Sequence, residues 1–344
     1  MLHHPGRPQA LIQAAALVTC LASFSSPANA VELYGIVDSY LASTKASGEA
    51  GNVVGIQSGG MSTAFWGMTG AEDLGNGLKA NFRLEGYFFT DTGTAGRLAT
   101  DTLHSRNAYV GLEGRLGEVR LGRLSNPMFL ATSQFDAFGG STKFSPILNP
   151  LWAPQYGRYI AGDTGWNNAI GYYTPEVGGL SGRFVYGLGE AAGTNSSNNA
   201  VAMLFLDRKP LTATAAYQRT RVGPGFPTGS WAQSVCVGAA AYDFQWAKAF
   251  LEYVGTRASG GARFRTDTFH IGTTIPAGPG RVMAAAVQTN IRADGQAGTW
   301  RRDIGLGYLY SFSKRTDGYV NVLYDKLSDK GSGTSAGIGI RHKF

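Results

Sequence analysis

Apolar and polar residues alternate along much of this chain, and residues 78–85 show the pattern most plainly. This segment reads LKANFRLE, so apolar side chains fall on one face of an extended strand and polar or charged side chains on the other. The same alternation occurs in residues 304–312 and, interrupted by His342, in residues 336–344. A period of two predicts β-strands with one apolar and one polar face.

About sixteen such segments fill the chain after residue 30. A membrane helix needs about 20 consecutive apolar residues, and the longest apolar run here is residues 200–206, whereas a tilted strand crosses a bilayer with about 10 residues and one apolar face. We therefore expect an all-β fold, a sixteen-stranded antiparallel transmembrane β-barrel. The strands are expected near residues 31–42, 60–70, 76–90, 103–114, 117–123, 166–174, 180–189, 199–206, 209–220, 232–242, 246–254, 265–275, 280–290, 300–312, 315–327 and 335–344.

The connections between these segments alternate between short and long. Seven are short turns rich in Gly, Asn, Asp or Pro, residues that suit tight reversals, among them residues 75–77, 114–117 and 207–208. The third long connection, residues 124–165, has about forty residues with many aromatic side chains and no sustained alternation. Its many apolar side chains would be poorly placed in water, so we expect this third external loop to fold into the barrel lumen and narrow it.

Sixteen strands could also form a soluble sandwich or a secreted adhesin whose polar faces simply meet solvent. Aromatic residues near the expected strand ends favour a membrane barrel, because such side chains gather where a bilayer meets water. They include Tyr87, Tyr172, Tyr242, Tyr308 and Phe312.

The first thirty residues have the pattern of a cleavable export signal. Arg7 precedes an apolar stretch that leads into Ala-Asn-Ala at residues 28–30, so we expect cleavage after Ala30 and a barrel domain from residue 31 to residue 344. A lipoprotein anchor at Cys20 is disfavoured, because Thr19 stands where a small residue is expected. Removing the signal leaves Cys236 as the one cysteine, which excludes an intrachain disulfide.

Composition agrees with a membrane barrel. The chain has 49 Gly and 15% charged residues, against about 25% charged in soluble domains. Its formal net charge is +7, and the basic residues are scattered rather than clustered. Export and scattered charge together argue against nucleic acid as a partner.

Several segments resemble trimeric general-diffusion porins of Gram-negative bacteria, in the β-proteobacterial branch that includes the neisserial and burkholderial types. The mature start LYGIVD at residues 33–38 is similar to the opening strand of that family. GAEDLGNGLKA at residues 70–80 resembles the turn after its second strand, and RNAYVGL at residues 106–112 resembles its fourth strand. The ending GIGIRHKF at residues 337–344 extends the similarity over the whole mature chain.

The resemblance implies an outer-membrane homotrimer that lets small hydrophilic solutes and inorganic ions diffuse passively through a water-filled channel. It implies contact with outer-membrane lipid and recognition of the terminal Phe344 by the outer-membrane assembly machinery. In the family, carboxylates of the inward loop face basic residues of the wall across a constriction, where opposed charges bias ion passage. The residues expected at the constriction here are Lys79, Arg83, Arg120 and Arg123 on the wall, Asp136 on the loop, and Glu85 as a compensating lumen carboxylate.

Three positions depart from the family pattern. Phe65 and Thr69 stand where basic residues usually precede the Glu-Asp-Leu-Gly motif, and Gly165 replaces a basic residue often found before Asn168. The wall arginines and the net positive charge still favour a modest anion preference. Whether other residues compensate for the three departures is left open by the sequence.

No catalytic constellation is evident in the sequence. Residues 333–337, GTSAG, fit the spacing of a nucleophile elbow, but they open a terminal strand instead of joining a strand to a helix. His104, His270 and His342 have no metal-ligand spacing, so we expect no enzyme activity, no cofactor and no metal. A substrate-specific channel, or a sealed barrel that acts as an adhesin or receptor, stays open as an alternative function.

Overall fold

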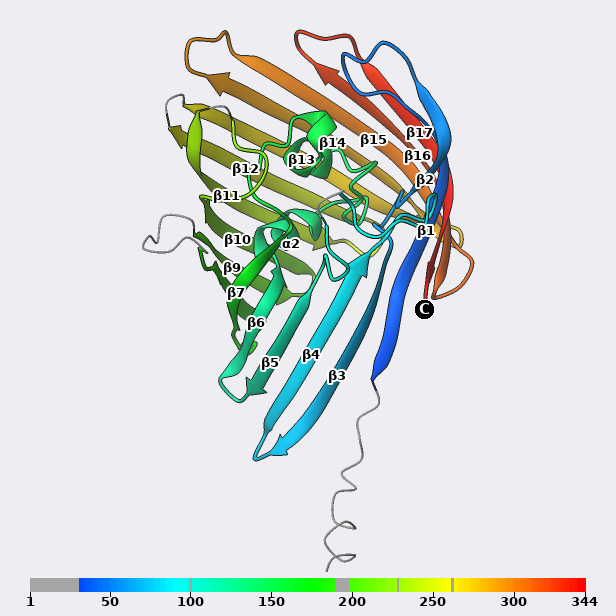
Figure 1. Cartoon of the computed structure of the whole chain (residues 1–344). Helices are drawn as coiled ribbons and strands as arrows, with labels where there is room; N and C mark the ends of the chain where they lie inside the picture. Colours follow the sequence, from blue (N-terminus) through cyan, green and yellow to red (C-terminus); the bar gives the residue numbers. More distant parts are fainter. Residues whose placement is uncertain (1–30, 99–100, 190–197, 228, 261–262) are drawn as a thin grey trace, which may run out of the picture.

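The computed structural model describes residues 31–98, 101–189, 198–227, 229–260 and 263–344, and the export signal expected at residues 1–30 lies outside them. The described residues form one antiparallel sheet of 17 strands that closes into a barrel (Figure 1). The strands are β1 (Glu32–Thr44), β2 (Val53–Ser58), β3 (Phe65–Gly75), β4 (Leu78–Tyr87), β5 (Ala108–Gly114), β6 (Gly117–Ser125), β7 (Gly165–Tyr173), β8 (Leu180–Gly187), β9 (Asn199–Arg208), β10 (Leu211–Thr220), β11 (Ser230–Asp243), β12 (Lys248–Gly260), β13 (Phe264–Ala277), β14 (Gly280–Ala293), β15 (Thr299–Ser311), β16 (Thr316–Leu327) and β17 (Gly333–Lys343).

The 17 strands occupy sixteen positions around the barrel. Each strand from β3 onward pairs with the next, and β1 closes the ring by pairing with β17 from Ile36↔Lys343 to Ser43↔Ala336. On its other side β1 pairs with β2 along one half and with β3 along the other half. β2 and β3 therefore share one position, which confirms the sixteen-stranded barrel expected from the alternation.

The second strand differs from the expectation of one segment near residues 60–70. The chain leaves the sheet at residues 59–64, and the carboxylate of Asp38 holds this break by accepting the backbone N–H groups of Gly60, Met61 and Ser62 at 3.1, 2.9 and 2.8 Å. Tyr319 on β16 donates its hydroxyl hydrogen to the same carboxylate at 2.5 Å. A buried side chain distant in sequence thus fixes the break, and local alternation carries no signal for it.

The barrel is apolar on its outer face. Leu251, Ile304 and Ile338 point outward and are 58%, 53% and 62% exposed, while inward neighbours such as Val254 and Met283 are fully buried. An exposed apolar wall with its packed side chains inside is the reverse of a soluble protein, and it matches a barrel surrounded by hydrocarbon.

The short turns agree with the expected ones, with one displacement. The turn expected at residues 207–208 lies two residues later, at Lys209 and Pro210, because β9 continues to Arg208. Since neighbouring strands are antiparallel, the short turns share one end of the barrel and the long connections share the other. We call these the short-turn end and the long-loop end.

Candidate functional site

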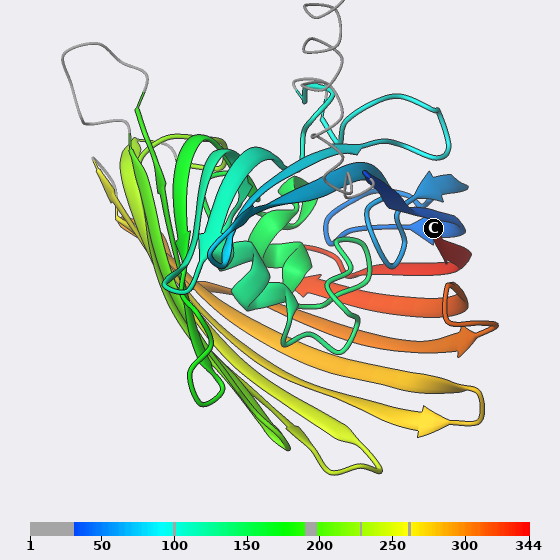
Figure 2. The same cartoon turned by 90° about the horizontal axis from the view of Figure 1, so that it is seen from below.

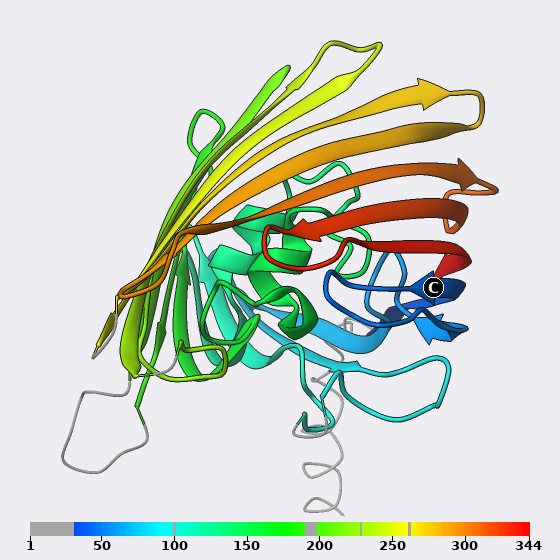
Figure 3. The ribbon, with the colours of Figure 1, turned by 90° about the horizontal axis from the view of Figure 1, so that it is seen from above.

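Residues 126–164 run inside the barrel, as Figures 2 and 3 show from below and from above, and we call them the inner segment. Asn126 begins it, and its side-chain oxygen accepts the backbone N–H of Met128 at 2.9 Å, which caps the first helix. That helix contacts β8, β9, β10 and β11, so it lies against this side of the wall. The elements of the segment are α2 (Pro127–Ser133), α3 (Leu148–Trp152) and η1 (Pro154–Tyr156).

Hydrogen bonds fix the inner segment to two sides of the barrel. On β11, the side chain of Gln233 accepts the backbone N–H of Ala161 at 2.8 Å and donates to the carbonyl of Tyr159 at 2.9 Å. Across the barrel, the hydroxyl of Ser141 donates to the carbonyl of Gly60, in the break between β2 and β3, at 2.6 Å. The segment therefore spans the interior instead of resting on one wall.

Apolar packing holds the middle of the inner segment. Phe135, Phe138 and Ile147 are fully buried in one hydrophobic cluster with the inward wall residues Val235 and Val254. Each large apolar side chain buried in this way contributes about 1.5–3 kcal/mol. The aromatic residues that broke the alternation in the sequence are thus the residues that fill one side of the lumen.

Asp136 lies in this packed region instead of facing open water. Its carboxylate is 3% exposed and accepts the backbone N–H of Gly140 at 3.0 Å. Burial raises the pKa of Asp136 to about 6, although hydrogen bonds act in the opposite direction. Glu252 on β12 lies close enough for the charge of Asp136 to act on it. Asp136 is therefore placed between the inner segment and the wall, away from the wall arginines expected to oppose it.

Arg83 on β4 and Arg120 on β6 lie together on the lumen wall. Both line a cavity of about 390 Å³ near the short-turn end. Arg120 forms an ion pair with Glu118 at 2.6 Å, and its guanidinium lies over the rings of Tyr109 and Tyr173, 4.7 and 4.1 Å from their centroids. In the described residues Arg83 has no such ion pair, and the same cavity is also lined by Glu32, Glu113 and Glu118.

Arg123 belongs to a second cluster nearer the inner segment. It forms an ion pair with Asp163 at 3.0 Å and donates to the side-chain oxygen of Asn167 at 2.6 Å. Arg97, from the connection between β4 and β5, reaches the same Asp163 at 3.1 Å. Burial acts to raise the pKa of Asp163, but the guanidinium groups of Arg97 and Arg123 outweigh it and hold that pKa below its usual range.

Glu85 and Lys79 lie apart from these clusters. Glu85 is fully buried, accepts a hydrogen bond from the hydroxyl of Tyr34 at 2.6 Å and forms an ion pair with Arg106. Its negative charge is therefore balanced inside the wall. Lys79 is exposed two residues from a short turn, opposite Glu113 in the register. The structure gives Glu85 an internal partner and leaves Lys79 at the mouth.

Other basic residues line a cavity of about 280 Å³ between the inner segment and the wall. Arg97, Lys143 and Arg158 contribute positive charge to it, and Asp163 is the acidic residue among its described lining. Burial lowers the pKa of both Lys143 and Arg158. The sequence analysis missed all three cations, because they lie in long connections where no periodicity indicates which way a side chain points.

The three departures from the family pattern each have an arginine beside them. The guanidinium of Arg106 lies over the ring of Phe65, 4.2 Å from its centroid. Arg83 is directly opposite Thr69 in the pairing of β3 with β4. A Cβ at Gly165 would lie 3.3 Å from a terminal nitrogen of Arg123, so that guanidinium occupies the space of the missing side chain.

A closed barrel with an apolar outer face, a charged inner face and a segment folded inside has the architecture of a membrane channel. The family model described as "Gram-negative porin" matches residues 14–330, and the chain belongs to this family. It is an outer-membrane porin of a Gram-negative bacterium.

Known relatives agree with this assignment. Outer membrane porin protein 32 of Delftia acidovorans is 32% identical, with 92% of this chain and 94% of the relative covered. The major outer membrane protein P.IB of Neisseria meningitidis is 26% identical, with 81% of this chain and 82% of the relative covered. These relatives confirm the resemblance to β-proteobacterial porins.

Solved structures agree with the fold. A structure described as an anion-selective porin from Comamonas acidovorans superposes with a TM-score of 0.77 and 29% sequence identity, covering 92% of this chain and all of that one. A trimeric form of OmpT from Vibrio cholerae superposes with a TM-score of 0.70 at 15% identity, which supports the fold alone.

Proposed function

We propose that this porin conducts small hydrophilic solutes and ions by passive diffusion, without a catalytic step, and with a modest preference for anions. The passage runs beside the inner segment, between it and the wall formed by β2 to β6. This proposal includes the residues expected from the sequence, with Arg83, Arg120 and Arg123 on the wall and Lys79 at the mouth. Asp136 and Glu85 act instead by holding the inner segment and the wall in place.

One observation carries the anion preference. The cavity beside the inner segment is lined by Arg97, Lys143 and Arg158 against Asp163 alone among its described lining. Asp163 is shared between Arg97 and Arg123, and Arg97 is also paired with Asp101 at 3.0 Å, so the uncompensated cations of the described lining are Lys143 and Arg158. An ion that enters this narrow region therefore meets net positive charge, and fixed charges in a confined passage raise the local concentration of counterions.

The test is the reversal potential of the refolded protein in a planar bilayer under a KCl gradient, because K⁺ and Cl⁻ have similar mobilities in water. We expect an anion-directed potential. Lys143→Gln should lower the ratio of chloride to potassium permeability up to about five-fold, since a unit charge about 8 Å away in water shifts the energies of the two ions by about 0.5 kcal/mol in opposite directions. Lys314→Gln, an exposed change in the turn after β15, should leave the ratio unchanged.

A cation-directed potential would contradict the anion preference and leave the porin assignment intact. Saturable block by one class of solute would favour a substrate-specific channel. Reproducible silence from protein with native barrel structure would favour a sealed barrel that acts as an adhesin or receptor.

We also propose that three copies assemble into a homotrimer. The support is the trimer described for the Vibrio cholerae neighbour and the exposed apolar wall, where Leu41, Val54 and Ile56 form a continuous outward surface on β1 and β2. Native mass spectrometry in mild detergent should give three times the mass of the mature chain, and a monomer mass at micromolar concentration would contradict the proposal.

The proposal also concerns the export signal and the terminal residue Phe344. We infer that residues 1–30 are removed on export and that Phe344 is read by the outer-membrane assembly machinery. Phe344 ends the last strand outward, and its backbone exchanges hydrogen bonds with Gly35 at 3.2 Å, so it also closes the barrel. Phe344→Ala should lower the amount of folded protein in the outer membrane, while pulse labelling should show unchanged synthesis.

A further inference from the structure

Aromatic side chains gather around the cavity of about 280 Å³ between the inner segment and the wall. Three lie at or directly after the end of β4, and two lie in α2 and α3; they are Tyr87, Phe88, Phe89, Phe129 and Trp152. Trp152 is buried and the other four rings are half-buried. A passage for inorganic ions needs only polar groups, so clustered rings at its edge mark a place for the apolar part of a solute.

The rings are held by contacts with one another and with neighbouring polar groups. Phe129 and Trp152 form an edge-to-face pair, with ring centroids 5.5 Å apart and ring planes at 85°. The indole N–H of Trp152 donates to the hydroxyl oxygen of Thr132 at 3.1 Å. The guanidinium of Arg97 lies over the ring of Tyr87, 4.7 Å from its centroid. The aromatic lining is thus ordered before a solute enters, which lowers the cost of binding.

Two cations of the same cavity lack a carboxylate partner within the described part of the chain. Lys143 forms no ion pair there. Arg158 donates to the carbonyl of Gly162 at 2.7 Å, while its Nε has no hydrogen-bond partner among the described residues. Burial lowers the pKa of both side chains, so carboxylates farther away do not offset it. An anion in the cavity supplies the missing charge.

The volume of the cavity limits the size of the solute. A cavity of about 150 Å³ holds benzene, so two such rings need roughly 300 Å³. The cavity of about 280 Å³ therefore has room for one ring and a small charged group.

We propose that this cavity binds an aromatic carboxylate, with its ring among the aromatic side chains and its carboxylate at Lys143 and Arg158. The inference rests on the proposed passage for anions and names the class of solute that this passage retains. An aliphatic acid meets the same cations but gains less from the rings, and a neutral arene leaves the cations without a partner. Binding is weak enough for release, because a solute that crosses the channel has to leave the site again.

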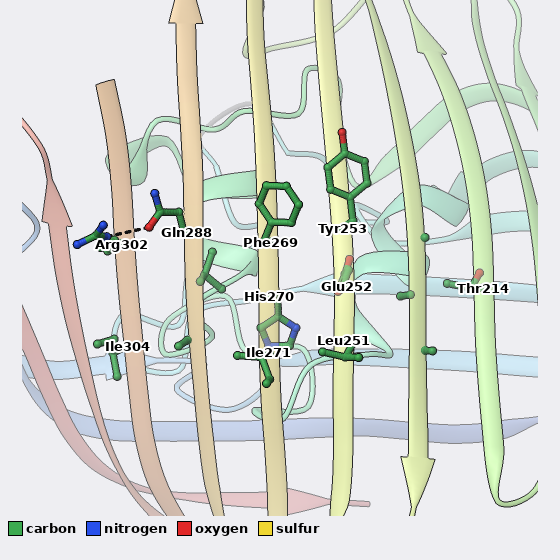
Figure 4. Close-up of a pocket in the computed structure, with 15 residues that line it drawn as sticks. Thr214, Leu251, Glu252, Tyr253, Phe269, His270, Ile271, Gln288, Arg302 and Ile304 are labelled. Carbon is green, nitrogen blue, oxygen red and sulfur yellow. Dashed lines mark hydrogen bonds between the residues drawn. The ribbon is translucent and has the colours of Figure 1, made fainter. Parts of the chain in front are cut away.

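The outer face of the barrel has a larger apolar groove, which is the competing location for such a ligand (Figure 4). It holds about 900 Å³, and its lining includes Arg302, which donates to the neutral side chain of Gln288 at 2.8 Å. Leu251, Phe269 and Ile304 along it are exposed on the face that meets hydrocarbon. An ionised acid dissolved in water reaches the lumen without entering hydrocarbon, so we assign it to the inner cavity.

The experiment compares benzoate with cyclohexanecarboxylate, two acids of equal charge and similar size, at pH 7.5. Dissociation constants are measured by calorimetric titration of the refolded protein in detergent and by saturable reduction of the ion current in a planar bilayer. We expect benzoate to bind about 5-fold more tightly, the size expected of one aromatic pair. Benzamide, which has the ring without the charge, should bind more weakly than benzoate.

Three variants separate the roles of ring and charge. Phe129→Leu removes one ring at similar apolar volume, so benzoate should bind about 5-fold more weakly while cyclohexanecarboxylate keeps its affinity. Phe89→Leu, on the wall side, tests the same point with a second ring. Lys143→Gln should weaken both acids about 10-fold, because a charge-assisted contact is lost. An unfolding temperature like that of the unchanged protein verifies that each variant is folded.

Matched controls make the same changes away from the cavity. Phe312→Leu and Lys314→Gln alter exposed positions after the end of β15, so both variants should bind the two acids like the unchanged protein. Arg302→Gln alters the outer groove and should also leave binding unchanged.

Equal affinity of the unchanged protein for benzoate and cyclohexanecarboxylate would overturn the proposal. Unchanged binding in Lys143→Gln would do the same, as would a loss of binding in Arg302→Gln, which would place the acid in the outer groove. A conducting channel without the preference contradicts this inference alone. Benzoate preference in the calorimeter without any ion current contradicts the proposed conduction and supports the site.

Discussion

Three arginines stand beside the three positions where this porin lacks a basic residue common in its family. Arg106 covers the ring of Phe65, Arg83 faces Thr69 across β3 and β4, and Arg123 occupies the space beside Gly165. A guanidinium supplied by a neighbouring strand can reach the volume that the lost side chain would have filled. Arg106 is paired with Glu85 and Arg123 with Asp163, so Arg83 is the one of the three arginines that has no ion pair in the described residues.

Arg83 gives the sharpest test of this argument. Its guanidinium lines the cavity near the short-turn end without an ion pair in the described residues. Replacing Arg83 by Glu changes the local charge by two units, so the permeability ratio of chloride to potassium should fall several-fold. The reversal potential under a KCl gradient measures this ratio. An unchanged potential in a folded channel would show that Arg83 lies outside the ion path.

Asp136 predicts a pH dependence of stability. Burial raises the pKa of Asp136 to about 6, above the value of about 3.9 in an unfolded chain. The folded protein therefore binds this proton more tightly. The stabilisation is complete below about pH 4 and is lost as the pH rises through 6, with an upper bound of about 3 kcal/mol.

Asp136→Asn should remove this loss, because an amide stays neutral at every pH. Thermal unfolding in detergent at pH 4 and pH 7.5 should then differ less in the variant than in the unchanged protein. Asp329→Asn, at an exposed position between β16 and β17, serves as the control and should keep the original difference. An equal difference in Asp136→Asn would show that Glu252 or another buried group carries the dependence.

At the scale of elements, alternation predicted the strands well and the irregular parts poorly. In segments such as β4, the sequence itself indicates which side chains point outward and which point inward, because one face meets hydrocarbon and the other meets water. The break at residues 59–64 depends on Asp38 and Tyr319, which are far away in the chain. The placement of Lys143 and Arg158 likewise depends on how the inner segment crosses the barrel. Contacts of this kind have no periodic signature.

Closure of the barrel depends on a close approach at Gly35. A Cβ there would lie 2.5 Å from the carbonyl oxygen of Phe65 and 2.6 Å from the ring of Phe344. Gly35→Ala should therefore destabilise the closed barrel by about 1–3 kcal/mol. Gly55→Ala on β2 is the matched control, because a Cβ at Gly55 meets nothing within 4 Å.

The measurement is the temperature at which the barrel unfolds. The difference in gel mobility between folded and unfolded protein reports the unfolding. Gly35→Ala should unfold at a lower temperature than Gly55→Ala, and Gly55→Ala should match the unchanged protein. Equal unfolding temperatures for the two variants would mean that β1 and β17 can shift apart without cost.

At the scale of the whole molecule, the positive charges fall into two groups, one facing the lumen and one on the outer wall. The lumen carries cations beside the inner segment, and the outer wall carries arginines at its long-loop end above an apolar groove. The formal net charge of +7 gives no indication of this division. The inner cations act on ions in water, whereas the outer arginines face the lipid interface, so the two sets should respond differently to salt.

Salt should weaken the anion preference of the channel. The Debye length is about 10 Å at 0.1 M and about 3 Å at 1 M, so dissolved ions in the passage screen the charges of Lys143 and Arg158 at high salt. The permeability ratio of chloride to potassium, measured at a fixed concentration ratio, should fall toward the bulk mobility ratio as the mean concentration rises from 0.1 M to 1 M. Lys143→Gln should show a smaller fall, because it begins with less charge. A ratio that stays constant over this range would indicate direct coordination of the anion by the wall in place of a screened field.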